Sequence, residues 1–328
     1  MTISVVIPVY NVAPYIRRSI TSVMQQTLPA TECIIVNDAS TDDSLELCRQ
    51  LIDGYTGSTR FVVLCHDRNR GLSAARNTGT DAATSTHIYY LDSDDEMTPD
   101  CLEKLAAAIG NDDSIEMVMG GLRRDWSNMR GMKARFKQWA YIKWGDWQSK
   151  HLKRKKRELK GNDEVYGWYY QEGKKRSNFV WNRLLKLSFV KENNLYNKEG
   201  LLLEDRLWNY YLIRCLQHVI ILPDVTYIYY RRPASIIVGT SAEKKRNHRG
   251  IIFREMADHV VLGERVEETR NRLKGFLQNY MRADGNEDYE HSFDVFLNQM
   301  VFCHQKKQVR QMIKAHQRRE RMCKQQTV

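Results

Sequence analysis

Long hydrophobic runs are missing from this sequence of 328 residues. Its longest apolar stretches, residues 4–9 and 218–222, are far shorter than the roughly 20 residues that a membrane-spanning helix needs. A basic leader with a cleavage site is missing too, because Met1 is followed at once by an apolar segment. The 42% of hydrophobic residues still suits a buried core. We therefore expect a soluble globular protein in the cytoplasm.

Paired metal ligands are also missing. The seven cysteines are scattered without a Cys-x-x-Cys pair, and the nine histidines have no spacing typical of zinc ligands. These observations argue against a zinc site and favour inert thiols in a reducing compartment. Internal repeats and low-complexity linkers are likewise missing.

Positive charge is concentrated in one segment. The chain carries a net charge of +11, and residues 123–160 alone hold fourteen lysines and arginines against three acids. A nucleic-acid-binding protein would spread this charge over the domain, so we expect no nucleic acid as a partner. Four of the seven tryptophans lie in the same segment. Three interpretations stay open: peripheral binding to an anionic membrane surface, binding of single-stranded nucleic acid, or a solvated helical hairpin.

The first hundred or so residues alternate strand-like and helix-like patterns. We predict strands at residues 4–9, 32–36, 61–65 and 87–91, and helices at residues 12–26, 44–52 and 71–83. This alternation predicts an α/β fold with a parallel sheet covered by helices. Ligand contacts are then expected at the carboxyl ends of the strands.

Polar clusters follow three of these strands. Residues 8–11, the pair Asn37-Asp38 and the acidic group Asp92, Asp94 and Asp95 would converge on one rim of the sheet. Neighbouring carboxylates raise one another's pKa unless a cation lies among them, and oxygen ligands suit Mg²⁺ or Mn²⁺. The alternative is an exposed acidic turn that stabilises the start of the next helix.

Four ordered motifs resemble the family 2 glycosyltransferases of the GT-A fold. They read SVVIPVYN at residues 4–11, NDASTD at 37–42, NRGLSAARNTG at 69–79 and LDSDD at 91–95. The resemblance is dense over the first 110 residues and resumes more loosely at residues 180–182 and 204–205. It implies a GT-A-type nucleotide-binding sheet flanked by helices, with a mainly helical C-terminal extension.

The patterns along the chain and the resemblance together divide the chain into four parts. Residues 1–122 would form the half that binds the nucleotide sugar, and residues 123–160 the basic, tryptophan-rich insertion. Residues 161–240 would form the acceptor and catalytic half of the same domain, and residues 241–328 the helical extension.

The resemblance assigns the nucleotide to the first two motifs and part of the fourth. Pro8, Val9 and Tyr10 would line the base pocket. Asp38 would accept a hydrogen bond from the uracil imide N–H, which favours UDP as the carrier. Asp92 would lie near the ribose and the water shell of the metal. Capping of the helix that begins near residue 44 is the alternative role for Asp38.

Two further carboxylates are assigned to the chemistry. Asp94 would ligate Mn²⁺ or Mg²⁺, and Asp205 resembles the general base of inverting members. The chemistry needs both types, because a cation stabilises the departing diphosphate and a carboxylate takes the proton of the acceptor hydroxyl. A purely structural role stays the alternative for Asp205 as a first-turn helix acid, and for Arg76 and Asn77 within their helix.

We therefore predict an inverting, metal-dependent glycosyltransferase. It would move a sugar from a UDP-sugar to a glycan or lipid-linked acceptor in the synthesis of a cell-surface polysaccharide, and the basic segment would bring it to the inner face of the membrane. The alternatives are a nucleotidyltransferase or a basic nucleic-acid-binding protein. A nucleotidyltransferase should have a lysine- and arginine-rich glycine loop near the N-terminus, and residues 8–13 contain none.

Overall fold

The computed structural model describes residues 1–125, 127, 155–169, 179–231 and 240–261. The chain divides into two compact units, Met1–Ser241 and Ala242–Val328. The described part of the second unit is the helix α10 (Ala242–Val261).

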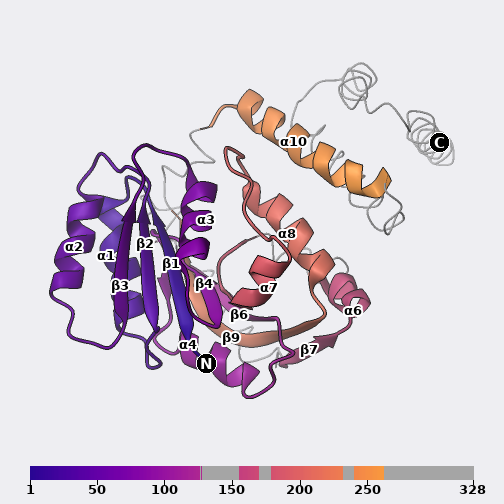
Figure 1. Ribbon diagram of the computed structural model, residues 1–328, viewed down its shortest axis with the longest axis horizontal. Helices are drawn as coiled ribbons and strands as arrows, with labels where there is room; N and C mark the ends of the chain where they lie inside the picture. Colours follow the sequence, from indigo (N-terminus) through magenta and orange to yellow (C-terminus); the bar gives the residue numbers. More distant parts are fainter. Residues whose placement is uncertain (126, 128–154, 170–178, 232–239, 262–328) are drawn as a thin grey trace. The chain divides into compact units, whose positions relative to one another are not determined.

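The described strands of the first unit form a nine-stranded sheet (Figure 1). They are β1 (Ile3–Val9), β2 (Glu32–Asn37), β3 (Arg60–Cys65), β4 (His87–Tyr90), β5 (Glu96–Met97), β6 (Met117–Asp125), β7 (Arg157–Lys160), β8 (Arg183–Lys186) and β9 (His218–Tyr230). Their order is β3-β2-β1-β4-β8-β6-β9-β5, and β7 pairs with β9.

The sheet is mixed, because antiparallel strands follow the four parallel strands predicted for the first hundred residues. β1 to β4 pair in parallel, as predicted. β8 runs antiparallel to both β4 and β6, whereas β6 and β9 are parallel to each other. The alternating pattern of strands and helices covers only the first four strands, and the direction of later strands depends on long-range pairing that local periodicity does not encode.

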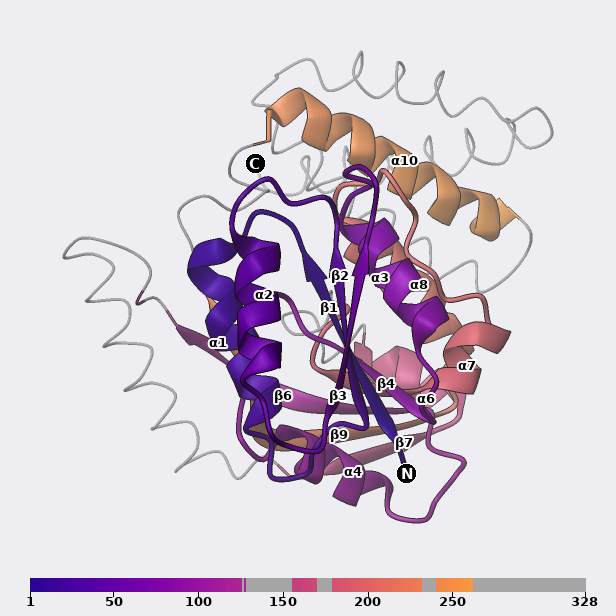
Figure 2. The same ribbon diagram turned by 60° about the vertical axis from the view of Figure 1, so that its left-hand side comes forward.

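Helices cover both faces of the sheet. They are α1 (Ala13–Met24), α2 (Ser44–Asp53), α3 (Leu72–Ala82), α4 (Cys101–Ile109), α6 (Asn162–Gly167), α7 (Leu187–Glu192) and α8 (Glu204–Cys215). Figures 1 and 2 show α1 and α2 together on one face, with α3, α7 and α8 on the other.

Alternating side chains of the central strands enter two separate hydrophobic cores. In β1, Val6 belongs to the core under α3 and α8, whereas Val5 and Ile7 belong to the core under α1 and α4. Such alternation follows from the two-residue period of a strand, and it explains why β1 reads as a continuous apolar run. Close packing also explains Gly79 in α3, because a Cβ there would lie 2.3 Å from Cγ1 of Val6.

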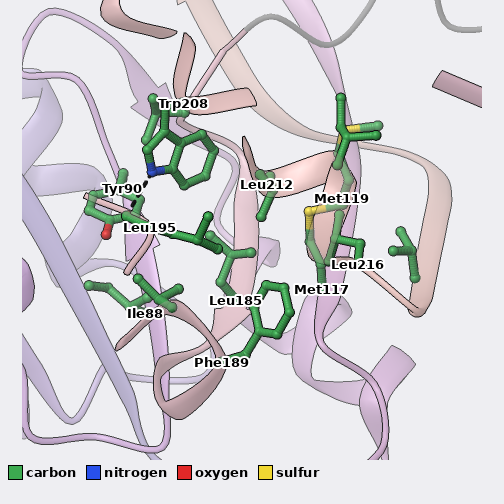
Figure 3. Close-up of a cluster of buried hydrophobic side chains, with 14 of the residues drawn as sticks. Ile88, Tyr90, Met117, Met119, Leu185, Phe189, Leu195, Trp208, Leu212 and Leu216 are labelled. Atoms are coloured by element: carbon green, nitrogen blue, oxygen red, sulfur yellow. Dashed lines mark hydrogen bonds between the residues drawn. The ribbon is translucent and has the colours of Figure 1, made fainter. Parts of the chain in front are cut away.

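The core under α8 fixes the helix whose second residue is Asp205, the predicted base (Figure 3). Trp208 lies one turn after Asp205, and its indole Nε1 donates to the carbonyl oxygen of Leu195 at 2.9 Å. Its ring also meets Tyr90 of β4 edge to face, with centroids 6.4 Å apart. A buried aromatic side chain held at both its ring and its N–H anchors the first turns of α8 against the sheet.

The predicted α/β fold class is therefore confirmed, while some details of the division differ. β6 crosses the predicted boundary between residues 122 and 123, and β7 occupies the last four residues of the predicted insertion. The ends of the basic segment are thus part of the sheet. Its four tryptophans, and the extension beyond residue 261, lie outside the described residues.

Candidate active site

The carboxyl ends of the central parallel strands meet as predicted. The backbone N–H of Asp38, after β2, donates to the carbonyl oxygen of Val9 in β1 at 2.8 Å. Asn11 accepts a hydrogen bond from the N–H of Thr41 at 2.8 Å through its side-chain oxygen. Both loops contain a left-handed residue, Asn11 and Ala39, with φ of 50° and 56°. The first two predicted motifs therefore form one connected rim.

The three residues predicted to line the base pocket differ in exposure. Pro8 and Val9 are buried, and Val9 belongs to the hydrophobic core under α1. Tyr10 is 45% exposed at the end of β1. Of these three residues, Tyr10 is thus the one with a side chain on the surface, and the base pocket itself stays a prediction.

Asp38 is buried and braces the third motif. Its carboxylate accepts hydrogen bonds from the backbone N–H groups of Arg70 at 2.8 Å and Gly71 at 2.7 Å, and it lies 2.6 Å from Nδ1 of His66. The hydroxyl and the backbone N–H of Ser44 both donate to the carboxylate of Asp42. Asp38 therefore does not cap α2. The hydrogen bond between Asp38 and uracil remains a prediction. The same carboxylate would then bind uracil and the backbone at the start of α3.

The acidic motif after β4 gathers three carboxylates. Single oxygen atoms of Asp92, Asp94 and Asp95 all lie within 4.8 Å of one another. Asp95 is buried, and its two oxygens accept from the Tyr227 hydroxyl at 2.7 Å and the Tyr230 N–H at 2.8 Å. One oxygen of Asp92 accepts from Arg76 at 2.7 Å. The two flanking carboxylates are therefore fixed by protein donors.

This donor set fits a hard divalent cation. Burial raises the pKa of Asp95 well above its ordinary value, and the charges of Asp94 and Asp92 raise it further, while the bonds from Tyr230 and Tyr227 oppose the shift. Such crowding of negative charge is relieved by a cation with oxygen ligands. Asp92 and Asp95 are held by neighbouring side chains and backbone, and the ligation of the ion by Asp94 stays a prediction.

Arg18 of α1 fixes the backbone of this motif. Its Nη2 donates to the carbonyl oxygen of Asp94 at 2.5 Å, and its guanidinium lies 3.4 Å above the ring centre of Tyr230. A guanidinium between a carbonyl and an aromatic face loses little freedom in each contact. Arg18 thus links the backbone of Asp94 to α1 and to Tyr230 of β9.

Arg76 links the acidic motif to the start of α8. Its Nη2 contacts Asp92 at 2.7 Å and its Nη1 contacts Glu204 at 2.9 Å, and its side chain is 3% exposed. The sequence interpretation treated Arg76 as a helix residue with no assigned partner. Its position inside the third motif was the signal available, but the motif does not say which carboxylates it meets.

Asp205, beside Glu204, has a different environment. Its Oδ1 is buried and has no hydrogen-bond partner among the described residues. Burial raises the pKa of Asp205 to about 7 and the charge of Glu204 adds to this, whereas Arg206 and Arg76 lower it. A carboxylate is suited to accept a proton when its pKa lies near neutrality and one of its oxygens is not already engaged in a hydrogen bond.

A stack of aromatic rings borders the acidic motif. Trp181 stacks on Tyr227 and on Phe179, with ring centres 4.2 Å apart in both pairs. The backbone of Phe179 is also tied to α8, since Asn209 donates to its carbonyl oxygen at 3.4 Å and to that of Asp205 at 2.7 Å. Trp181 therefore contacts Tyr227, which binds Asp95, and Phe179, whose backbone is tied to α8, and the sequence motif alone does not reveal these contacts.

A family model for glycosyl transferase family 2 matches residues 4–172. None of the described helices has both the length and the apolar composition required to cross a bilayer.

Three relatives illustrate the similarity. Glycosyltransferase GlyG of Streptococcus pneumoniae serotype 4 is 26% identical over 285 residues, covering 86% of this chain and 88% of GlyG. The uncharacterized glycosyltransferase EpsJ of Bacillus subtilis strain 168 is 27% identical over 71% of this chain and 62% of EpsJ. The uncharacterized glycosyltransferase YibD of Escherichia coli strain K12 is 39% identical over 34% of this chain. The matched segment spans only 31% of the length of YibD.

Solved structures show the same fold. The crystal structure of S. aureus TarS 1–349 in complex with UDP-GlcNAc has a TM-score of 0.60 and 21% sequence identity, covering 86% of this chain and 72% of that chain. TarS 1–349 in complex with UDP has a TM-score of 0.56 and covers 78% and 65%. The predicted GT-A-type fold is therefore confirmed. Because the family model covers more than half of the chain and its motifs form one rim, this chain belongs to glycosyl transferase family 2.

Proposed function

We propose that the chain is an inverting glycosyltransferase that moves a sugar from a UDP-sugar to a glycan or lipid-linked acceptor. The observation that carries the proposal is the pairing of two carboxylate sites through Arg76. One site is the acidic motif around Asp94, and the other is Asp205 with its raised pKa. Single displacement at an anomeric carbon needs one group to stabilise the leaving diphosphate and a separate group to take a proton.

The bond changes are those of a single displacement. The acceptor hydroxyl oxygen attacks the anomeric carbon from the face opposite the nucleotide, and the bond from that carbon to the diphosphate oxygen breaks. The diphosphate leaves with the electron pair, and Asp205 takes the proton of the hydroxyl. One displacement inverts the anomeric centre.

Asp94 would hold Mn²⁺ or Mg²⁺, with Asp92 near its water shell. When bound, such an ion neutralises negative charge on the diphosphate. The task of Arg18, Tyr227 and Tyr230 in this account is to keep the carboxylates in place before the donor arrives. Preorganised charge is more effective than charge that must reorient during the reaction.

The choice of UDP rests on the rim and on the structural neighbours. TarS has been crystallised with UDP and with UDP-GlcNAc. In this chain Asp38 and Tyr10 would bind the uracil base, and UDP-GlcNAc is therefore the first donor to test.

The basic segment supports a proposal about location. Residues 123–160 carry a net charge of +11 with four tryptophans, which favours peripheral binding to an anionic inner membrane face where a lipid-linked acceptor or growing cell-surface polysaccharide would lie.

The proposal is tested by donor hydrolysis, which needs no knowledge of the acceptor. A panel of UDP-sugars is incubated with the protein and Mn²⁺, and released UDP is measured, with the Asp94→Ala variant as the matched control. We expect UDP release from one donor in the parent and little in the variant. Proton NMR of the released sugar at early times should show the inverted anomer. Release of the retained anomer would contradict the single displacement, and equal release by the variant would contradict the role of Asp94.

A further inference from the structure

We propose that Arg76 is a positioning residue that holds Asp205 in register with the acidic motif by bridging Asp92 and Glu204. This inference rests on the proposed function, because it concerns how the two carboxylate sites are kept together. Arg76 itself is not assigned a contact with substrate. It acts through Glu204, the residue next to Asp205.

The bridge joins three elements that are distant in the sequence. Arg76 lies in α3, Asp92 follows β4, and Glu204 is the first residue of α8. Both contacts use separate guanidinium nitrogens, Nη2 to Asp92 at 2.7 Å and Nη1 to Glu204 at 2.9 Å. The planar fork of arginine fixes the direction of both carboxylates at once, which a lysine ammonium cannot reproduce.

The guanidinium of Arg76 is buried, so its charge must stay paired. The Arg76 side chain is almost completely buried, and its Nε has no hydrogen-bond partner among the described residues. A buried charge is tolerated when it is paired, and removing one partner leaves the others uncompensated. The two carboxylates are therefore coupled: a shift of either one disturbs the charge balance of the other.

The backbone conformation just before Glu204 supports the inference that the ion pair with Arg76 fixes the start of α8. Leu203 adopts a left-handed conformation with φ of 65° and ψ of 33°. A bulky residue such as leucine rarely adopts this conformation, which glycine adopts readily. The left-handed conformation of such a residue persists where the surrounding structure enforces it. The Arg76 contact comes directly after this turn. The ion pair thus holds the chain at the point where it turns into α8 and sets the position of Asp205.

Charged groups reach Asp205 from three elements. Glu204 and Arg206 lie beside it in α8, Arg76 faces it from α3, and Arg183 contributes from β8. The guanidinium of Arg183 lies over the ring of Trp208, with a distance of 5.6 Å to the ring centre. Loss of the positive charge of Arg76 alone should therefore raise the pKa of Asp205, whereas a change that keeps the charge should not.

Two substitutions separate geometry from charge. In Arg76→Lys the charge stays and the fork is lost, so UDP-GlcNAc hydrolysis should fall about 10–100-fold while the acidic limb of its pH profile stays in place. In Arg76→Met the charge is lost as well, so the limb should also move to higher pH. Arg60→Lys is the matched control, because Arg60 pairs with the buried Glu32 away from the site, and its turnover should stay within about twofold of the parent.

A second measurement does not depend on activity. The effect of Asp205→Asn on the urea midpoint is followed against pH in the parent and in Arg76→Met. The effect should level off at a higher pH, and should be larger there, in the Arg76→Met background, because the folded-state pKa of Asp205 is then higher. If no donor is hydrolysed by any variant but this shift occurs, the proposed function fails and the coupling stands. Parental turnover of folded Arg76→Lys, or the same pH dependence in both backgrounds, would overturn the proposal.

Discussion

Arg76 pairs with Glu204 at 2.9 Å, whereas the adjacent Asp205 has no ion pair with any residue that the structure describes. The two neighbouring acids therefore have different tasks. Glu204 neutralises a buried guanidinium, whereas Asp205 keeps a buried Oδ1 without a hydrogen-bond partner in the described part of the chain. On sequence alone, Glu204 and Asp205 are equivalent first-turn acids. The contacts favour Asp205 as the group that accepts a proton.

The raised pKa of Asp205 predicts a pH-dependent stability. The pKa rises from 3.8 to about 7 on folding, so the folded state holds a proton more strongly, and stability is lost as pH rises through this window. Asp205→Asn never carries this buried charge. We expect it to be more stable than the parent at pH 8, by on the order of 1–4 kcal/mol, with a smaller gain at pH 4. Urea unfolding at both pH values measures this. A gain of equal size at both would contradict the raised pKa.

Metal dependence should reside in Asp94. We expect UDP to bind more weakly to the parent when Mn²⁺ and Mg²⁺ are chelated, because the diphosphate then lacks a cation. Asp94→Ala should bind UDP equally weakly with and without metal. Titration calorimetry with UDP in the presence and absence of EDTA measures both. Metal-independent binding of UDP by the parent would remove this role.

Asp38 is expected to affect both nucleotide binding and stability. Asp38→Ala removes the acceptor for the uracil imide and also the acceptor for the N–H groups of Arg70 and Gly71. We expect UDP affinity to fall by about 1–3 kcal/mol and stability to fall by a similar amount. UDP titration is carried out at a temperature where the variant is folded. Lower stability with unchanged UDP affinity would restrict Asp38 to bracing the start of α3.

Membrane association is tested without disturbing the sheet. Deleting the whole basic segment would remove β7, so a better variant replaces Lys153, Arg154, Lys155 and Lys156 with glutamine and keeps Arg157–Lys160. The parent should sediment with anionic vesicles and be released above about 0.5 M salt, where the screening length falls to a few ångströms. The variant should sediment less. Equal sedimentation with neutral vesicles would contradict an electrostatic contact.

The local elements at the start of the chain could be predicted from sequence. The two-residue and 3.6-residue periods there agree with the turn residues, so β1 to β4 and α1 to α3 lie within a few residues of their predicted positions. The positions of the later strands β6, β8 and β9 were harder to predict from the sequence. β6 contains Gly120 and Gly121, where its register with β9 shifts, and no local pattern shows that β8 inserts between β4 and β6.

The candidate site was predictable only in part, for a related reason. Carboxylates that follow a strand are visible in a sequence, which is why Asp92 and Asp94 could be singled out, whereas Asp205 in the first turn of α8 was named from the resemblance. Their supporting residues come from elsewhere in the chain: Arg76 from α3 and Tyr227 from β9. These pairings depend on the tertiary fold, and single-sequence periodicity carries no information about them.

The most direct test of the account is the turnover of Asp205→Asn. The substitution keeps the size of the side chain but removes its ability to take a proton, so UDP release from the hydrolysed donor should fall by about 10²–10⁴-fold while UDP affinity stays within about threefold of the parent. Asp163→Asn is the matched control, since Asp163 also lies in the first turn of a helix, and its turnover should equal that of the parent. Turnover above a tenth of the parental rate in folded Asp205→Asn would contradict its role as the base.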